Sequence, residues 1–300
     1  MLPNLIVAGA GKSGTSSLHL YLDQHPDIVM TTTKEPHVFT DPERLAHAQQ
    51  IYAELFPPAA ASSRYRGESS TGYMVFPGVP DRIHAAIPDC RLIFLLRNPI
   101  DRALSHYRWL ISLGAERRDF RTVFESDRAD VPDPRSSPSG NYGYLYQEGC
   151  YATNLARFIP PFRSDQTLLL VAEELRADPL TCLNRCAAFL GLPGFTAVTP
   201  VAANETRSLR YPRVRARLEG RLPGSASTPH RVRAAVRKVV GERRARALRD
   251  AAVASLGSTE VDVPINVDRS WLAGIYAAEV AALRARDPDF TEVWLADFPL

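Results

Sequence analysis

Cysteine is scarce in this sequence. The four cysteines among 300 residues are Cys90, Cys150, Cys182 and Cys186, and no two of them form a CxxC pair. This spacing disfavours both a disulfide framework and a zinc site, so we expect reduced thiols. Cys182 and Cys186 would share a helix face, but no histidine or aspartate cluster flanks them. Such a pair is typical of core packing.

Long hydrophobic runs and a strong net charge are also lacking. The first apolar run, residues 5–11, is cut short by Lys12, and no stretch approaches the length of a membrane span. The 36 Lys and Arg residues nearly balance the 33 Asp and Glu residues and leave a formal charge of +3. This balance does not require a nucleic-acid or membrane partner. We therefore predict a soluble, cytoplasmic protein with no membrane span that binds no nucleic acid.

Polar and apolar segments alternate at the start of the chain in the order of a strand, a turn, a helix and a second strand. We expect a strand over residues 5–8, a turn over 9–13, a helix over 14–24 and a strand over 28–30. A strand–helix–strand unit of this length implies that its strands pair in parallel.

Two further strand–loop–helix units follow. Arg91–Leu96 is a continuous apolar run, typical of a strand covered on both faces. Asn98 is the predicted N-cap of the helix after it. The segment 167–175 begins the third unit, whose helix starts at Asp178 and ends at Gly191. This order predicts an α/β protein, with a three-layer P-loop-like fold in which helices flank a central parallel sheet.

Less regular segments lie between and after these units. Residues 127–141 are rich in Pro, Ser and Asp and predict a surface loop. Residues 213–250 are rich in arginine and predict a helical insert, whose arginines form a solvated face or recognise an anionic acceptor or a nucleic acid. We expect a C-terminal helix at about 268–286 and a single domain over residues 1–300.

A glycine- and hydroxyl-rich turn follows the first predicted strand. Such a strand, turn and helix present backbone N–H groups and a helix N-terminus to an anion, and Lys12 adds a positive charge. The turn therefore predicts a phosphate site. The motif of nucleotide triphosphatases, GxxxxGK[ST], fits only at its end, because Ile6 stands in the place of the first glycine.

Enzymes with that motif also need a carboxylate at the end of a neighbouring strand to hold magnesium. The strand over residues 91–96 is followed by a cation, Arg97, which weakens this hypothesis. Glu173 and Glu174 are competing candidates for the metal ligand. A magnesium-dependent P-loop kinase or NTPase stays an alternative, and a non-enzymatic nucleotide- or nucleic-acid-binding module is a second one.

Several motifs occur in order along the chain: KSGTSSL, HPDI, KEPHVF, GESSTGYM, RLIFLLRNPIDRALSHY, GCYATNLARFIPPF and LLLVAEELRADP. Together they resemble the sulfotransferase family that uses 3′-phosphoadenosine 5′-phosphosulfate (PAPS), especially its bacterial and glycosaminoglycan-modifying branch. The resemblance covers most of the chain outside the Arg-rich segment. It implies in-line transfer of a sulfo group from PAPS to a hydroxyl, with adenosine 3′,5′-bisphosphate (PAP) as the second product and no metal.

The resemblance also implies the residues of a PAPS site. The first motif would hold the 5′-phosphosulfate, and the motif after the strand over residues 91–96 would hold the 3′-phosphate. The implied cofactor-binding residues are Lys12, Ser13, Gly14, Thr15, Ser16, Ser17, Arg97, Ser105, Arg210 and Arg213. Taken alone, Arg97 is typical of a surface ion pair and Ser105 of a solvated helix face. An arginine does, however, offer phosphate a matching fork of donors.

The loop after the second predicted strand carries the catalytic candidates. By the resemblance, Glu35 is the general base, His37 assists it, and Lys12 neutralises charge on the leaving oxygen. The loop lies at the strand ends, where ligands bind in open α/β sheets. Without the resemblance, Glu35 is typical of a turn carboxylate, and His37 is typical of a structural histidine.

Two departures from the family pattern concern the acceptor. The glycosaminoglycan-modifying branch often has a further lysine where this chain has Ser69 or Ser70. It has an acidic residue where this chain has Thr40, with Asp41 one place later. A polyanionic chain would be favoured by that lysine. We therefore predict a small molecule or a glycoside as the acceptor.

Overall fold

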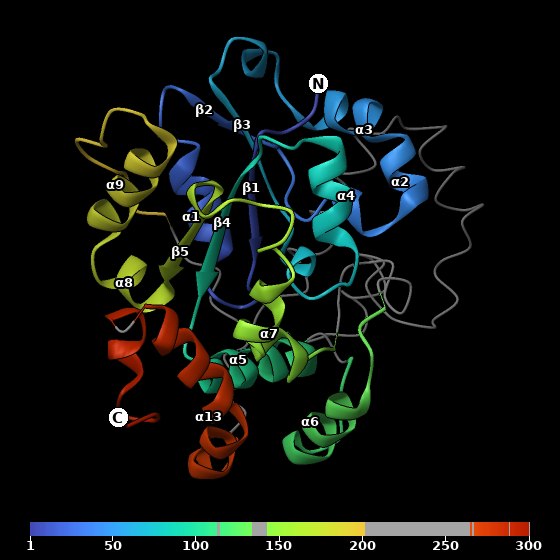
Figure 1. The fold of residues 1–300 in the computed structure, drawn as a ribbon, viewed down its shortest axis with the longest axis vertical. Helices are drawn as coiled ribbons and strands as arrows, with labels where there is room; N and C mark the ends of the chain where they lie inside the picture. The colour runs from blue at the N-terminus through green and yellow to red at the C-terminus, as the bar shows by residue number, and fades with distance from the viewer. Residues whose placement is uncertain (113–114, 134–142, 202–264, 266, 288, 300) are drawn as a thin grey trace, which may run out of the picture.

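A parallel sheet of five strands forms the centre of the described part of the chain (Figure 1). The computed structural model describes residues 1–112, 115–133, 143–201, 265, 267–287 and 289–299. The strands are β1 (Leu5–Gly9), β2 (Ile28–Met30), β3 (Tyr65–Ser69), β4 (Arg91–Leu96) and β5 (Thr167–Val171). Neighbouring strands are parallel, in the order β2-β3-β1-β4-β5. The predicted α/β fold with a central parallel sheet is confirmed.

The neighbours of β1 differ from the expectation that β1 and β2 pair. β3 lies between them and pairs with both, through Leu5 with Gly67 and Ile28 with Tyr65. The sequence of β3, YRGES, contains no apolar run, so no strand was predicted there. Its buried end instead carries the polar side chain of Glu68. This order brings the segment after β3 to the same sheet edge as the turn after β1.

Helices cover both faces of the sheet, as Figure 1 shows. The helices on one face are α1 (Thr15–Leu22), α8 (Ala172–Ala177) and α9 (Pro179–Leu190). Those on the other face are α4 (Val79–Ala86), α5 (Pro99–Ser112), α7 (Tyr151–Ala156) and α13 (Arg269–Arg286). In β1, Leu5 and Val7 pack into the core beneath α1, α8 and α9, and Ile6 and Ala8 pack into the core on the opposite face. Alternation of strand side chains thus produces the expected three layers.

Shorter elements complete the described chain. They are α2 (Pro42–Ala46), α3 (Ala48–Leu55), α6 (Phe120–Ala129), and the 3₁₀ segments η1 (Val38–Thr40), η2 (Pro58–Ala61), η3 (Thr71–Tyr73), η5 (Gln147–Gly149), η6 (Ser164–Gln166) and η7 (Asp289–Trp294). Asp41 caps α2, because its Oδ1 accepts a hydrogen bond from the Glu43 N–H at 2.9 Å. No helix in the described ranges is long and apolar enough to cross a membrane.

Two predicted helix ends are confirmed. The Asn98 Oδ1 accepts a hydrogen bond from the Ile100 N–H at 3.0 Å, so Asn98 caps α5. Gly191 follows the last residue of α9 with a φ of 62°, a conformation that favours glycine. All four cysteines are buried thiols, and Cys182 and Cys186 lie on α9 and face the core.

Other bounds differ from those expected. The first helix ends at Leu22 rather than at residue 24. The segment 167–175 divides into β5 and the start of α8, and α6 extends to Ala129 into the expected loop over 127–141. There the buried carboxylate of Asp127 accepts a hydrogen bond from the Tyr146 N–H. The Arg-rich segment 213–250 lies outside the described residues, and α13 occupies the range expected for the C-terminal helix.

Candidate active site

The turn after β1 leads directly into α1 at the C-terminal edge of the sheet. Lys12 has a φ of 66° and Gly14 a φ of 93°. The left-handed conformation costs a residue other than glycine about 1–2 kcal/mol, so the turn is held by its surroundings. The Gly14 carbonyl accepts hydrogen bonds from the N–H groups of Ser17 and Leu18 at 3.0 and 3.1 Å. Gly14 is therefore the N-cap of α1, and the N–H groups at the start of this helix point toward the turn.

Lys12 is a half-buried cation held against an aromatic ring. Its Nζ lies 5.1 Å from the centroid of the Trp109 ring. The pKa of Lys12 is lowered to about 8, mainly by burial; Glu148 raises it, and the neighbouring Arg97 and Lys34 lower it. The cluster of cations around Lys12 favours an anion at this position.

A second lysine, which the sequence analysis did not single out, lies at the same turn. The Lys34 Nζ donates hydrogen bonds to the hydroxyl oxygens of Thr15 at 3.1 Å and Ser16 at 2.9 Å. It also lies 3.6 Å from the Glu35 Oε1. Each hydroxyl that accepts from Lys34 keeps its own proton to donate to an anion. The only sequence signal for Lys34 is that it opens the motif KEPHVF.

Glu35 and His37 form a pair in the loop after β2. The Glu35 Oε2 accepts a hydrogen bond from the Thr71 N–H at 2.9 Å and lies 3.3 Å from the His37 Nε2. The Glu35 side chain is 33% exposed, so a substrate hydroxyl can reach it. Burial lowers the pKa of His37, while Glu35 raises it. The structure thus brings the two predicted catalytic residues of this loop together with Lys34, and through Lys34 with the turn.

Arg97 follows β4 and contacts the turn. Its Nη1 donates a hydrogen bond to the Lys12 carbonyl at 3.3 Å, and its buried Nε has no hydrogen-bond partner among the described residues. A buried donor of this kind is costly unless a ligand accepts from it. Ser105 lies half-buried on α5, and no hydrogen bond joins it to Arg97 in the described structure. Arg210 and Arg213 lie outside the described residues.

Comparisons with known proteins show the family to which the chain belongs. The family model described as the sulfotransferase domain matches residues 2–211. The chain belongs to the sulfotransferase domain family. A bovine bifunctional heparan sulfate N-deacetylase/N-sulfotransferase 2 is 30% identical over 216 residues, which are 70% of this chain and 23% of that protein. A mouse heparan sulfate glucosamine 3-O-sulfotransferase 3B1 is 31% identical over 192 residues, which are 64% of this chain and 46% of that protein.

The chain spans less than half of the length of each of these relatives of the sulfotransferase domain family. Its fold also resembles that of a sulfotransferase from Alicyclobacillus acidocaldarius, with a TM-score of 0.60 and 24% identity over 95% of both chains. The family predicted from the sequence motifs is confirmed by these matches.

A buried carboxylate lies directly beneath the turn of this family member. The Glu148 Oε2 accepts a hydrogen bond from the Arg102 Nη1 at 3.1 Å and lies 3.6 Å from the His106 Nδ1. A β-carbon at Gly11 would lie only 2.4 Å from the same oxygen, so this position requires glycine. Burial raises the pKa of Glu148 to about 7, although Arg102 lowers it. Nothing in the sequence pattern marks Glu148, which reaches the turn from η5.

The N-cap of α5 joins three distant parts of the family member next to Arg97. The Asn98 N–H donates to the Glu173 Oε1 at 3.0 Å, and its Nδ2 donates to the Asp297 Oδ2 at 2.8 Å. Arg269 pairs with Asp297 at 2.6 Å and with Asp101 at 2.8 Å. These contacts fix the start of α5 and with it the backbone that carries Arg97.

The two carboxylates considered as magnesium ligands already have partners. Besides the Asn98 N–H, Glu173 accepts a hydrogen bond from the Trp294 Nε1 at 3.3 Å. Glu174 pairs with Arg185 at 2.7 Å. Both therefore serve contacts between elements, and the magnesium-dependent kinase or NTPase alternative gains no support from them.

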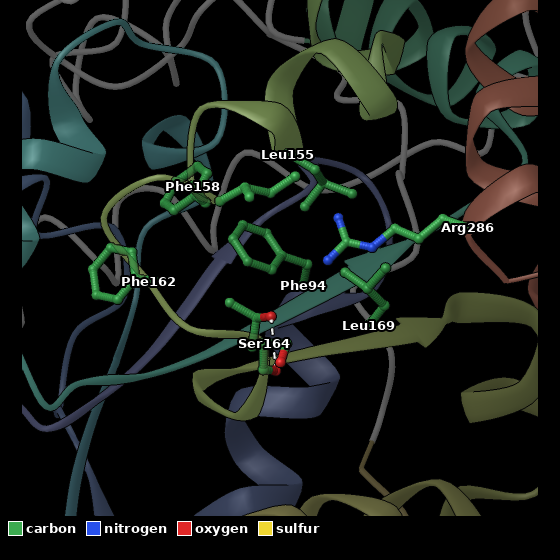
Figure 2. A pocket seen from close by; sticks show the side chains of 9 residues that line it. Phe94, Leu155, Phe158, Phe162, Ser164, Leu169 and Arg286 are labelled. Atoms are coloured by element: carbon green, nitrogen blue, oxygen red, sulfur yellow. Dashed lines mark hydrogen bonds between the residues drawn. The ribbon is translucent and has the colours of Figure 1, made fainter.

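A small cavity lies between β4, β5 and the segment after α7, and Figure 2 shows the side chains that line it. It has a volume of about 60 Å³ and is lined by apolar side chains, including Phe94 of β4, with Arg286 of α13 at its side. None of the predicted site residues lines it. Ligand sites usually measure about 300–1,000 Å³, so this cavity is too small for a nucleotide.

Proposed function

We propose that this protein transfers a sulfo group from PAPS to a hydroxyl of a small molecule or glycoside. One observation carries the proposal. Lys34 connects the anion-binding turn to a candidate base, because its Nζ contacts the hydroxyls of Thr15 and Ser16 and lies 3.6 Å from the Glu35 carboxylate. A reaction that moves an anionic group to a deprotonated acceptor needs these two features side by side.

The charges at the sheet edge fit PAPS, which carries a phosphosulfate and a separate 3′-phosphate. The residues that would hold it are Lys12, Ser13, Gly14, Thr15, Ser16 and Ser17 for the phosphosulfate, and Arg97 and Ser105 for the 3′-phosphate, with Arg210 and Arg213 as further candidates. The unpaired, buried Nε of Arg97 supports this assignment, since a phosphate oxygen would accept from it. When bound, PAPS supplies the sulfo group.

The side chains of this protein have separate tasks in the transfer. Glu35 takes the proton of the acceptor hydroxyl, and the Thr71 N–H and His37 orient its carboxylate. Lys12 stabilises the negative charge that develops on the leaving phosphate oxygen. Lys34 lies between the turn and Glu35 and holds the hydroxyls of the turn in a fixed orientation.

The acceptor class follows from the strand next to the turn. Ser69 and Ser70 are fully buried, and Ser69 is bonded to His19 at 2.9 Å rather than facing an acceptor. The described residues therefore place no cation at the position where the glycosaminoglycan-modifying branch often has its extra lysine. A neutral or weakly charged acceptor suits this edge better than a polyanion.

The test is incubation of the full chain with PAPS and pools of phenols, alcohols and glycosides, followed by mass spectrometry for the addition of one sulfo group. We expect a sulfated product in at least one pool and a strongly reduced yield with Glu35→Gln. His37→Ala should cost less activity, because His37 only orients the carboxylate. Lack of PAP binding by calorimetry together with magnesium-dependent ATP turnover would contradict the proposal and support the kinase or NTPase alternative.

A further inference from the structure

A chain of buried polar groups runs beneath the Glu35–His37 pair. Glu68, on β3, is fully buried. Its Oε1 accepts a hydrogen bond from the Tyr52 hydroxyl at 2.9 Å, and its Oε2 accepts one from the Ser70 hydroxyl at 2.8 Å. The Ser70 Oγ in turn accepts a hydrogen bond from the His37 N–H at 3.0 Å. The chain thus connects a buried carboxylate to the backbone of a candidate active-site residue.

The direction of the Ser70 hydroxyl follows from the chemistry of its partners. When Glu68 is ionised, its carboxylate only accepts hydrogen bonds, and the His37 N–H only donates. The single hydroxyl proton of Ser70 therefore points at Glu68, and a lone pair faces His37. Without the carboxylate, the hydroxyl would be free to turn its proton toward the His37 N–H, and the contact would be lost.

The same stretch of chain holds the rest of the loop. The Glu35 N–H donates to the Ser69 carbonyl at 2.8 Å, and the Thr71 N–H donates to the Glu35 carboxylate at 2.9 Å. Residues 68–71 therefore fix the loop over 35–37 at three points. Ser70 holds the His37 N–H, and Thr40 holds the His37 carbonyl through its own N–H at 3.3 Å and its hydroxyl at 2.7 Å. The Ser70 contact therefore helps to set the distance between the imidazole and the Glu35 carboxylate.

The loop needs such support because its backbone is strained. Glu35 has a φ of 58° and His37 a φ of 50°, both in the left-handed region that favours glycine. Conformations of this kind persist only where neighbouring groups fix them, and they are frequent at functional sites. A loop released from Ser70 would relax toward ordinary φ values and move both side chains.

We propose that Glu68 is a positioning residue that acts through Ser70 to hold His37, and through it the Glu35 carboxylate, in the geometry needed for proton removal. This inference rests on the proposed sulfotransfer. In this role Ser70, the residue after β3, transmits the position of the buried Glu68 carboxylate to His37. Burial raises the pKa of Glu68 to about 7, and the hydrogen bonds from Tyr73, Ser70 and Tyr52 lower it.

Tyr52→Phe is the matched control, because Tyr52 donates to the other oxygen of the same carboxylate and does not touch Ser70. Ser70→Ala removes the acceptor for His37 and should lower kcat by about 10- to 100-fold, the usual effect of a small misplacement of a reacting group. In Ser70→Ala, the KM for PAPS and the affinity for PAP should stay within about twofold, because the Ser70 side chain bonds to Glu68 and His37 and not to the turn after β1. Tyr52→Phe should lower the thermal stability but leave kcat unchanged.

Two variants of Glu68 test the route through Ser70. Glu68→Gln keeps an oxygen that can accept from Ser70 and should retain kcat within about threefold. Glu68→Leu removes the acceptor and should lower kcat as much as Ser70→Ala does. The double variant that combines Glu68→Leu with Ser70→Ala should be no slower than either single variant, because both act on the same contact. If Glu68→Leu fails to fold, the comparison of Ser70→Ala with Tyr52→Phe still decides the matter.

Amide hydrogen exchange provides a measurement independent of turnover. The peptide that contains His37 should exchange faster in Ser70→Ala than in the unsubstituted protein, and Tyr52→Phe should not change it. Equal kcat and equal exchange in Ser70→Ala and Tyr52→Phe would overturn the inference. Lack of sulfotransfer by the unsubstituted protein would instead overturn the proposed function. The exchange result can be obtained in either case, because it does not depend on turnover.

Discussion

Substitution of Arg97 tests the phosphate assignment most directly. Arg97 makes one contact to the turn, from its Nη1 to the Lys12 carbonyl at 3.3 Å, and has one buried donor, Nε, without a partner. Loss of this long contact to the carbonyl costs about 0.5–1.5 kcal/mol and affects every ligand of the turn. Loss of a charge-assisted bond to the 3′-phosphate costs a further 1.5–3 kcal/mol, roughly 10- to 150-fold in Kd, and affects only ligands that carry this phosphate.

Calorimetry with two ligands separates these contributions. Arg97→Ala should weaken PAP by the sum of both and weaken adenosine 5′-phosphate, which lacks the 3′-phosphate, by the first alone. Arg97→Lys is the control, because it keeps the charge but loses the Nε donor and the planar fork, and it should recover only part of the PAP affinity. Equal losses for the two ligands in Arg97→Ala would show that Arg97 supports the turn and does not bind the 3′-phosphate.

Three further outcomes are expected. Glu35→Gln should lower turnover by about 10²–10⁴-fold with PAP affinity unchanged, and near-normal turnover would remove Glu35 from its role as the base. Burial lowers the pKa of Lys12 to about 8, so Lys12 loses its charge as the pH rises through this value; PAP affinity should fall above it, and should fall less in Lys12→Arg. Gly11→Ala places a β-carbon 2.4 Å from the Glu148 carboxylate and should lower the free energy of unfolding by about 1–3 kcal/mol in urea. Gly143→Ala, where a β-carbon meets nothing within 4 Å, is its control.

Most of the fold could be predicted from apolar runs, which mark the strands, and from capping and turn residues, which mark the helix ends. The strands with continuous apolar sequences, such as Arg91–Leu96, were identified, and so were the cap at Asn98 and the helix end at Gly191. β3 was missed because its buried residues are a glycine, a glutamate and a serine rather than aliphatic residues. A polar side chain can occupy a central strand when hydrogen bonds satisfy it, and Tyr52 does this for Glu68.

The candidate site was predicted only in those residues that belong to motifs. Lys12, Glu35 and Arg97 lie at the strand ends where the motifs placed them. Glu148 was not found, because it comes from a distant segment and contacts the turn only after folding. Contacts between segments far apart in the sequence leave no periodicity or spacing in one chain, so no pattern marks them.

The junction at Asn98 has a consequence for where the functional unit ends. The family model stops at residue 211, and every motif considered for the PAPS site except Arg213 lies before that point. Asp297, however, accepts a hydrogen bond from the residue adjacent to Arg97, and Arg269 fastens Asp297 to Asp101 on α5. A fragment cut at residue 211 would keep nearly all of the recognisable motifs yet lose the contacts that hold the start of α5 next to Arg97. The contacts of Arg269 and Asp297 thus stabilise the backbone next to Arg97, although neither residue belongs to a recognised motif.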